Sequence, residues 1–320
     1  MSLRGRPEGE HRSAQHEGSP WISRGRPEGE LRSAQHEGSP LTPHGRPERE
    51  HRSAHQEDSS ITAHTAIKPN DRDWKALVRA AAEPYRAAGL FSHGFARGKL
   101  GVDPVFRHII GHGLIAPRAR VLDIGCGQGL LAGLLRAAAA QASRGEWPRS
   151  WAAAPEGTRI TGIELMAKDV ARARAALGAT AQAEFIHGDM RRTPFRKADV
   201  VVILDVLHYI DIAEQDAVLD RVRSALPAGG RLLLRIGDDS PNARFHASQI
   251  VDRLVTFIRG HRRVPTFTRP LAAWINRIEA LGFTVQAQPM SQGTPFANVL
   301  LTAQLPVAAA QPARSRETSK

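Results

Sequence analysis

The 320-residue sequence has a single cysteine, Cys126, and it lacks any long run of uncharged apolar residues. One cysteine excludes a framework of disulfides within the chain and suits a reducing compartment. No segment approaches the roughly 18 apolar residues that a membrane-spanning helix needs. The first residues, MSLRGRPEGEHRS, have no apolar core and do not resemble a signal peptide. These absences predict a cytoplasmic protein without a transmembrane segment.

The sequence has fewer acidic than basic residues: 32 Asp and Glu against 44 Lys and Arg, which gives a net charge of +12. Residues 1–65 carry nine Arg against ten acidic residues, so the positive excess belongs to the rest of the chain. A basic surface fits an anionic partner such as nucleic acid. Alternatively, arginine, with 38 residues against six Lys, fills ordinary solvated positions. We favour the second interpretation, so nucleic acid is not the expected partner.

Residues 4–60 contain few apolar residues and consist of a repeat. The segment RGRPEGEHRSAQHEGSP (4–20) recurs at 24–40 and, degraded, at 44–60, with a period of 20. Stacked repeats need a shared apolar face, which these units lack. We therefore predict that residues 1–65 form a disordered tail of three repeats, and that residues 306–320 form a second one.

Beyond residue 70, strand-like and helix-like segments alternate. Strands are expected at 119–124, 159–164, 183–187, 198–204, 231–236, 283–288 and 297–304, and helices at 128–140, 166–177, 213–225 and 270–281. Apolar strands such as VVVILDV fit a sheet covered on both faces. The alternation predicts an α/β fold, a doubly wound, mostly parallel seven-stranded sheet, within a domain of residues 66–305 whose core covers 119–304.

Residues 70–115 are expected to form a helical cap before this core. A helix begins near residue 70 and is bent at Pro84, because proline disrupts the helical hydrogen bonds. The glycines of FSHGFARGKLG predict a loop over 91–101. A further helix is expected over 104–111, with Asp103 as its N-cap.

The stretch VLDIGCGQGL places glycines at three alternate positions directly after a strand: Gly125, Gly127 and Gly129. Ligands of open α/β sheets bind at the carboxyl ends of strands, and glycine lets the backbone approach them closely. A dinucleotide fold prefers G-x-G-x-x-G, but Leu130 stands where its third glycine would be, and no G-x-x-x-x-G-K-[ST] loop occurs. Asp123 would repel a pyrophosphate and suits an ammonium or sulfonium group.

These residues resemble the first motif of the class I S-adenosylmethionine-dependent methyltransferases of the small-molecule type, and the resemblance runs from about residue 90 to 304. It implies a Rossmann-like methyltransferase fold with S-adenosyl-L-methionine as cofactor. Asp123 would lie near the amino group of the cofactor, and the turn with its three glycines and Cys126 would line the methionine part. Segments such as FARGKL and GTPFANVLL faintly resemble methyltransferases of bacterial aryl polyene pathways. That likeness implies an aromatic or carrier-bound acyl acceptor.

The resemblance assigns further cofactor contacts at the ends of the next two strands. Glu164 would accept hydrogen bonds from both ribose hydroxyls, with Leu165 beside it, although a solvated glutamate is the alternative. The segment 141–158 is interpreted as an insertion that lengthens the spacing to this residue. In FIHGDM, Asp189 would accept from the adenine amino group and Met190 would pack on the ring; a helix N-cap is the other role open to Asp189.

The segment VVILDVLHYI resembles the fourth motif, whose strand tip borders the reactive methyl group, and it brings Asp205, Leu207, His208 and Tyr209 to that place. Methyl transfer from a sulfonium needs mainly alignment and exclusion of water. A hydroxyl or ring-carbon acceptor also needs a base, for which His208 is the first candidate and Tyr209 the second, although either residue can simply pack. No metal pattern is evident; Asp205 with Asp238 and Asp239 is an alternative Mg²⁺ set.

The acceptor side is expected to involve the cap and residues 238–268. Arg97 and Lys99 can cover the cofactor carboxylate or bind an acidic substrate. The helix-like segment 250–258 forms core or a lid or, with the basic residues beyond it, a docking surface for an acidic carrier protein or an anionic membrane. An RNA or protein methyltransferase and a non-catalytic binding module remain alternatives. The sequence LDVLHY, in place of an NPPY-type motif, favours a small-molecule acceptor.

Overall fold

The computed structural model describes residues 71–178, 182–237, 266–292 and 298–307, all within the unit Thr62–Lys320. The repeats, the helix-like segment 250–258 and residues 308–320 lie outside the described residues. The predictions of two disordered tails and of the domain boundaries therefore stay predictions.

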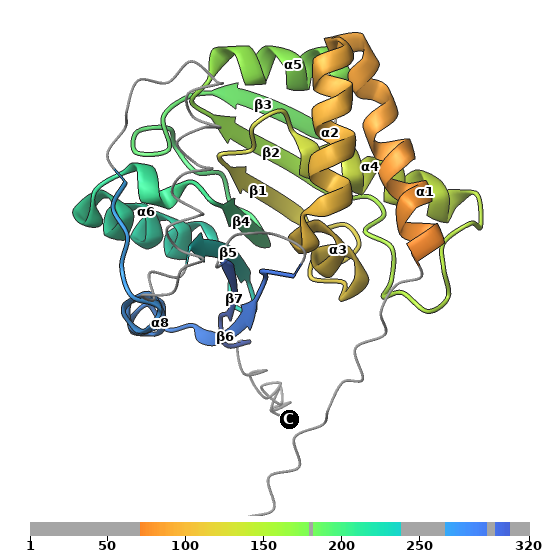
Figure 1. Ribbon diagram of the computed structural model, residues 1–320. Helices are drawn as coiled ribbons and strands as arrows, with labels where there is room; N and C mark the ends of the chain where they lie inside the picture. The colour runs from red at the N-terminus through yellow and green to blue at the C-terminus, as the bar shows by residue number, and fades with distance from the viewer. Residues whose placement is uncertain (1–70, 179–181, 238–265, 293–297, 308–320) are drawn as a thin grey trace, which may run out of the picture. The chain divides into compact units, whose positions relative to one another are not determined.

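A seven-stranded sheet forms the core, with the strand order β3-β2-β1-β4-β5-β7-β6 (Figure 1). Strands β1 to β5 run parallel, and β7 pairs antiparallel with both β5 and β6. The strands are β1 (Arg120–Ile124), β2 (Arg159–Glu164), β3 (Ala183–His187), β4 (Val200–Leu204), β5 (Arg231–Gly237), β6 (Thr284–Pro289) and β7 (Asn298–Gln304). The predicted mostly parallel seven-stranded sheet is confirmed, and the strand ends differ by no more than two residues.

Helices cover both faces of the sheet, as expected for a doubly wound fold (Figure 1). One face packs against α1 (Asp71–Ala82), α4 (Leu130–Ser143) and α5 (Ala167–Leu177), and the other against α6 (Ile212–Ala225) and α8 (Leu271–Ala280). Successive strand residues alternate between the two cores, so that Val121 joins the first and Leu122 the second. None of the helices in the described ranges is long and apolar enough to cross a bilayer.

The cap differs from the prediction in one element. After α1 the chain continues as the 3₁₀ helix η1 (Glu83–Ala88), which contains Pro84, and then forms α2 (Leu90–Val102) where a loop was expected over 91–101. The loop prediction is wrong because it gave weight to the three glycines of α2. Ser92, Ala96 and Leu100 recur every fourth residue and are buried, and this packing outweighs the poor helix propensity of glycine.

The last cap helix, α3 (Pro104–Gly111), is confirmed together with its N-cap. The side chain of Asp103 accepts a hydrogen bond from the backbone N–H of Val105 at 3.1 Å, and Pro104 occupies the first helical position. Asp103 is nevertheless buried, which is unusual for a simple N-cap, and its second role concerns the site described below.

The predicted insertion over 141–158 packs on the cap. Trp151 is buried, with its ring centroid 6.4 Å from that of Trp74 in α1 and 5.0 Å from that of Trp147. The indole N–H of Trp147 donates to the carbonyl of Ala152 at 2.9 Å. Contacts among three tryptophans therefore attach the insertion to α1.

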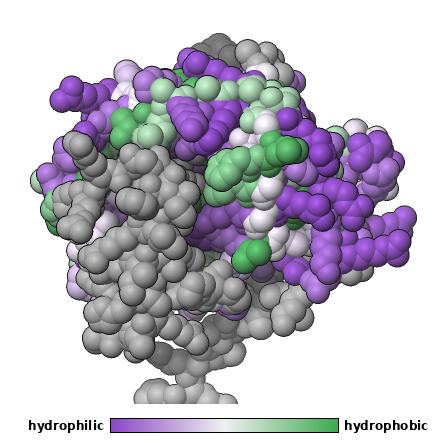
Figure 2. Space-filling model, turned by 45° about the horizontal axis from the view of Figure 1, so that its top comes forward, coloured by the Kyte–Doolittle hydropathy of each residue, from purple (hydrophilic) through white to green (hydrophobic). Residues whose placement is uncertain are grey.

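The outward face of α2 is apolar. Leu90, Phe91 and Val102 are 80%, 61% and 65% exposed, and Gly94 and Gly98 lie between them on the same face. Figure 2 shows this side of the molecule, where hydrophobic residues (green) and residues of intermediate hydropathy (white) lie among hydrophilic ones (purple). Three large apolar side chains of α2 are therefore exposed, two at its start and one at its end.

Candidate functional site

The glycine turn after β1 adopts a left-handed backbone at each glycine. The φ angles of Gly125, Gly127 and Gly129 are 75°, 56° and 73°. A Cβ on Gly125 would lie 2.5 Å from Val206, and one on Gly129 would lie 2.6 Å from Phe185, so these two glycines let the turn pack against its surroundings. A Cβ on Gly127 would meet nothing within 4 Å. The middle of the turn therefore faces open space, where a ligand can touch the backbone.

Backbone hydrogen bonds attach the turn to the neighbouring strand. The N–H groups of Gly125 and Cys126 donate to the carbonyl of Ile163 in β2, at 2.8 and 3.2 Å. The Cys126 side chain packs toward β2, since a Cβ on Gly162 would lie 2.6 Å from its Sγ atom. Burial raises the pKa of the Cys126 thiol well above its ordinary value. The Cys126 side chain is therefore buried against β2, and only its backbone can contact a ligand at the turn.

Two carboxylates lie beside the turn. Asp123 is 5% exposed, and burial, followed by the charge of Glu164, raises the pKa of its carboxyl to about 7. Glu164 accepts hydrogen bonds from the N–H groups of Gly127 at 2.9 Å and Met166 at 2.8 Å, one on each oxygen. This geometry brings both predicted carboxylates to the turn, and their charge favours a cationic ligand in the open space at Gly127.

The residues predicted to contact an adenine lie around the ends of β2 and β3. Leu165 is 57% exposed. Asp189 binds Arg191, with Oδ2 2.6 Å from Nη2, and this ion pair lowers the pKa of its carboxyl. It also accepts from the N–H of Arg191 at 2.9 Å and caps a turn, so the alternative of a helix N-cap is wrong. Half-buried Met190 packs against the core under β4, and its contact with a base stays a prediction.

Near the carboxyl ends of β4 and β5, the buried guanidinium of Arg235, a residue of β5, joins the sheet to the cap. Arg235 is 2% exposed and lies between Asp205, whose Oδ1 is 2.8 Å from Nε, and Asp103, whose Oδ2 is 2.8 Å from Nη2. Burial alone would raise the pKa of Asp103, but hydrogen bonds and charges from Arg235 and Lys99 lower it to about 2. Lys99, predicted to bind a ligand carboxylate, instead lies 2.8 Å from Asp103, whereas Arg97 is exposed.

The sequence did not reveal Arg235 as a site residue. It lies 132 residues from Asp103, and nothing in the local pattern LLLRIGD distinguishes a buried arginine from a solvated one. Asp205 has a φ of 59°, a left-handed conformation that is rare for a residue with a side chain, and the double contact with Arg235 holds it there. This charge network is therefore a part of the site that only the structure shows.

The alternative Mg²⁺ set is not supported by the described residues. Asp205 is paired with Arg235, and Asp238 and Asp239 lie outside the described part of the chain. Within the ranges that the structure describes, no three acidic, histidine or cysteine side chains gather in a way that could hold a metal ion.

The catalytic candidates lie in η2 (Leu207–Tyr209), directly after Asp205. The ring centroids of His208 and Tyr209 are 4.1 Å apart. The backbone carbonyl of His208 accepts from the N–H of Phe267 at 2.8 Å, so the segment after residue 265 lies against η2. Sequence reasoning placed both side chains near the fourth strand tip, and the structure confirms that position, whereas their chemical roles stay predictions.

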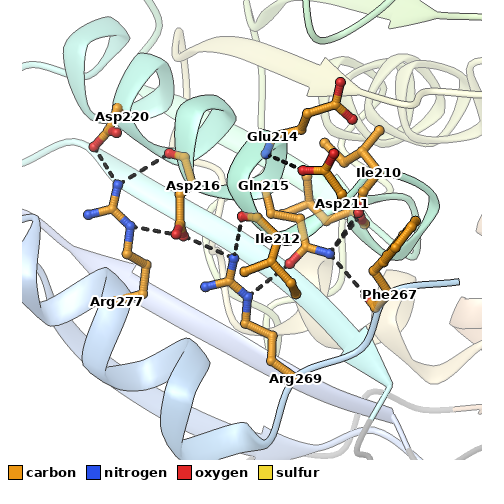
Figure 3. A network of polar contacts seen from close by, with 11 residues as sticks. Ile210, Asp211, Ile212, Glu214, Gln215, Asp216, Asp220, Phe267, Arg269 and Arg277 are labelled. Carbon is orange, nitrogen blue, oxygen red and sulfur yellow. Dashed lines mark hydrogen bonds and ion pairs between the residues drawn. The ribbon is translucent and has the colours of Figure 1, made fainter.

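A buried amide fixes η2 in place (Figure 3). Gln215 of α6 is fully buried, and its Nε2 donates to the carbonyls of Leu207 at 3.2 Å, Ile210 at 3.0 Å and Phe267 at 2.9 Å. Its Oε1 accepts from Nε of Arg269 at 2.9 Å. Every polar atom of the amide is used, so η2, α6 and the segment 266–270 form one rigid support.

Comparison with known proteins identifies the fold. Residues 95–288, more than half of the chain, match the family model of a methyltransferase domain. The chain belongs to this family. Members of the family take their methyl group from S-adenosylmethionine, and the resemblance inferred from the glycine turn and the strand tips is confirmed.

Similar proteins share part of the chain. It is 31% identical to the carboxy-S-adenosyl-L-methionine synthase of Chromohalobacter salexigens over 160 residues, which cover 45% of this chain and 54% of that protein. It is 30% identical to the tetracenomycin polyketide synthesis 8-O-methyl transferase TcmO of Streptomyces glaucescens over 93 residues, which cover 28% and 27%. The chain thus spans about half, or less, of the length of these curated relatives.

Solved structures that the chain is similar to include the magnesium protoporphyrin IX methyltransferase of Synechocystis PCC 6803 with bound SAH. It is 20% identical with a TM-score of 0.46, over 69% of this chain and 91% of that one. An O-methyltransferase family protein from Burkholderia thailandensis is 20% identical with a TM-score of 0.48, over 70% and 63%.

Proposed function

We propose that this protein transfers a methyl group from S-adenosyl-L-methionine to a small, largely apolar acceptor. The observation that carries the proposal is the glycine turn: its centre, Gly127, is open to solvent and backed by Asp123 and Glu164. A ligand with positive charge on both an ammonium and a sulfonium group complements this pocket, and a pyrophosphate does not.

The ribose and adenine of the donor are proposed to bind residues at the carboxyl ends of β2 and β3. Each oxygen of Glu164 accepts one backbone N–H and keeps a further lone pair for a ribose hydroxyl. Exposed Leu165 offers an apolar surface to one face of the adenine, and Asp189 with Met190 lies at the next strand tip. An adenine amino group at Asp189 would share this carboxylate with Arg191.

The transfer step needs alignment more than acid–base chemistry. The acceptor atom attacks the methyl carbon in line with sulfur, the carbon–sulfur bond breaks, and a neutral thioether leaves. When the acceptor is a hydroxyl, His208 or Tyr209 takes its proton, a role that requires η2 to be held firmly. Gln215 supplies that support through its hydrogen bonds to Leu207 and Ile210.

The exposed apolar face of α2 supports an aromatic or carrier-bound acyl acceptor. Phe91, near the start of α2, lies 5.2 Å from the guanidinium carbon of Arg172 in α5, and the residue after α2, Asp103, binds Arg235 near the tip of β5. The two ends of α2 therefore lie near α5 and near Arg235, and the second of them is close to the proposed transfer site. An apolar acceptor can lie between Phe91 and Val102, and an acidic carrier protein remains a candidate partner.

The match with a carboxy-S-adenosyl-L-methionine synthase favours a second candidate function. In that case S-adenosylmethionine is itself the substrate and keeps its adenosyl group. Its methyl carbon loses a proton and bonds to a carboxyl carbon that a carboxylic-acid co-reactant releases by breaking its own carbon–carbon bond. The donor pocket would be the same, and the apolar face of α2 would play no part in the reaction.

One assay separates these possibilities. The protein is incubated with S-adenosylmethionine labelled in the methyl group and with separate panels of aromatic acids, carrier-bound acyl groups, bulk RNA and protein, and both products are followed by mass spectrometry. We expect S-adenosylhomocysteine and label in a small aromatic or acyl product. Label in RNA or protein, or a carboxylated adenosyl product, would contradict the proposal.

A further inference from the structure

A tyrosine of the cap is bonded to the glycine turn. Tyr85 in η1 is fully buried, and its hydroxyl donates to the carbonyl of Gly129 at 2.8 Å across 44 residues of sequence. That carbonyl also accepts the N–H of Gly133 at 3.0 Å, the first hydrogen bond of α4. Both lone pairs of the Gly129 oxygen are therefore used, and its direction is fixed.

A second glycine makes room for this tyrosine. Gly133 lies inside α4, where glycine is less favourable than alanine. A Cβ at this position would lie 3.1 Å from both Cε2 and the hydroxyl oxygen of Tyr85, and 3.3 Å from the carbonyl of Ala81. Glycine at position 133 therefore leaves space for the ring of Tyr85. This is a second observation, independent of the hydrogen bond, that supports a specific contact between Tyr85 and α4.

The contact acts on the conformation of the turn. Gly129 is the N-cap of α4, has a φ of 73° and offers no side chain to cap the helix. Its N–H, in the preceding peptide, donates to the carbonyl of Cys126 at 2.9 Å. Both peptides meet at the Cα atom of Gly129, so a change in the φ or ψ angle of Gly129 would move the turn around Gly127 relative to α4. Burial raises the pKa of Tyr85 far above its usual range, and the hydroxyl remains a donor at any physiological pH.

We infer that Tyr85 is a positioning residue for the donor: it holds the Gly129 carbonyl, and through it the turn, in the conformation that leaves Gly127 open. This inference rests on the proposed function, because it concerns the same donor pocket. It also couples the cap to the donor, so that binding of an adenosyl ligand stabilises the docked cap and loss of the tyrosine hydroxyl weakens binding.

The test uses the full chain and S-adenosylhomocysteine (SAH) as the probe. Tyr85→Phe removes one oxygen, and Gly133→Ala displaces the ring while improving the helix propensity of α4. The matched control is Ile109→Val in α3, a buried residue of the same core with no part in the turn. Calorimetry gives the Kd for SAH, and thermal unfolding with and without SAH gives the Tm of each variant.

We expect the Kd for SAH to rise about fivefold to tenfold in Tyr85→Phe, the change that one neutral hydrogen bond supports. It should also rise in Gly133→Ala, whose Tm changes little, and stay within twofold of the unaltered protein in Ile109→Val, whose Tm falls. If both Tyr85→Phe and Gly133→Ala bind SAH as the unaltered protein does and differ only in Tm, the inference about Tyr85 is wrong, while the proposed function is unaffected. No SAH binding by the unaltered protein would overturn the proposed donor and this inference with it.

Discussion

The donor side and the acceptor side of the site are held by different kinds of contact. On the donor side, the glycine turn and Glu164 are fixed by backbone hydrogen bonds and by left-handed glycine conformations. On the acceptor side, Asp205 and η2 are fixed by side chains, namely the guanidinium of Arg235 and the amide of Gln215. Both arrangements hold their part of the site in one conformation. A substitution on the donor side should affect mainly ligand binding, and one on the acceptor side mainly the stability of the fold.

The difference follows from what each side must do. A donor that is the same for a whole family can be read by main-chain atoms, which vary little with sequence. An acceptor that differs from one enzyme to the next must be met by side chains and by a cap that can be altered. The buried ion network of Arg235 is one point where the cap joins the sheet, so its loss should lower the stability of the fold.

The largest expected effect is a loss of folding stability when the ion network on the acceptor side is broken. Arg235→Met leaves Asp103 and Asp205 without their guanidinium, and removing one partner of a buried ion pair costs about 3–5 kcal/mol. Urea unfolding should show this loss in the free energy of unfolding. The SAH affinity of the folded variant should change by less than about twofold, because the glycine turn is untouched.

Arg120→Met is the control, since its pair with Asp199 is 52% and 38% exposed and should contribute about 0–1 kcal/mol. Equal losses in the two variants would show that the Arg235 network contributes no more than a surface ion pair.

A smaller effect, confined to ligand binding, is expected on the donor side. Gly127→Ala places a Cβ in a left-handed residue that faces the proposed ligand, with a backbone cost of about 1–2 kcal/mol. We expect the Kd for SAH to rise about 10–100-fold, measured by calorimetry. Gly145→Ala is the matched control, because Gly145 has a φ of 72° and open space around it but lies beyond the end of α4. If both variants bind SAH equally well, Gly127 does not touch the donor.

The smallest effect is a pH dependence of donor binding. The pKa of Asp123 is about 7 in the ligand-free protein, above its ordinary value of 3.8, so the folded protein loses stability from this group as the pH rises between those values. An ammonium group nearby favours the ionised carboxylate. SAH should therefore bind up to about tenfold more weakly at pH 6 than at pH 8, with release of a proton. In Asp123→Asn this dependence should vanish; its persistence would mean that another group titrates.

The sequence predicted short-range features better than long-range contacts, for a physical reason. The strands, the glycine turn and Glu164 follow from short-range patterns, and the structure places them where they were expected. The loop over 91–101 is instead a helix, because the burial of Ser92, Ala96 and Leu100 depends on neighbours that local propensity does not describe. Tyr85 and Arg235 act on partners 44 and 132 residues away, and only tertiary structure brings such pairs together.

The central claim is that the bare turn after β1 binds an adenosyl donor through its backbone. Calorimetric titration of the full chain with SAH, S-adenosylmethionine and NAD⁺ in parallel tests it most directly. The account predicts saturable one-to-one binding of both adenosyl ligands and no measurable uptake of the dinucleotide. Preferential binding of NAD⁺, or no heat with either adenosyl ligand, would contradict it.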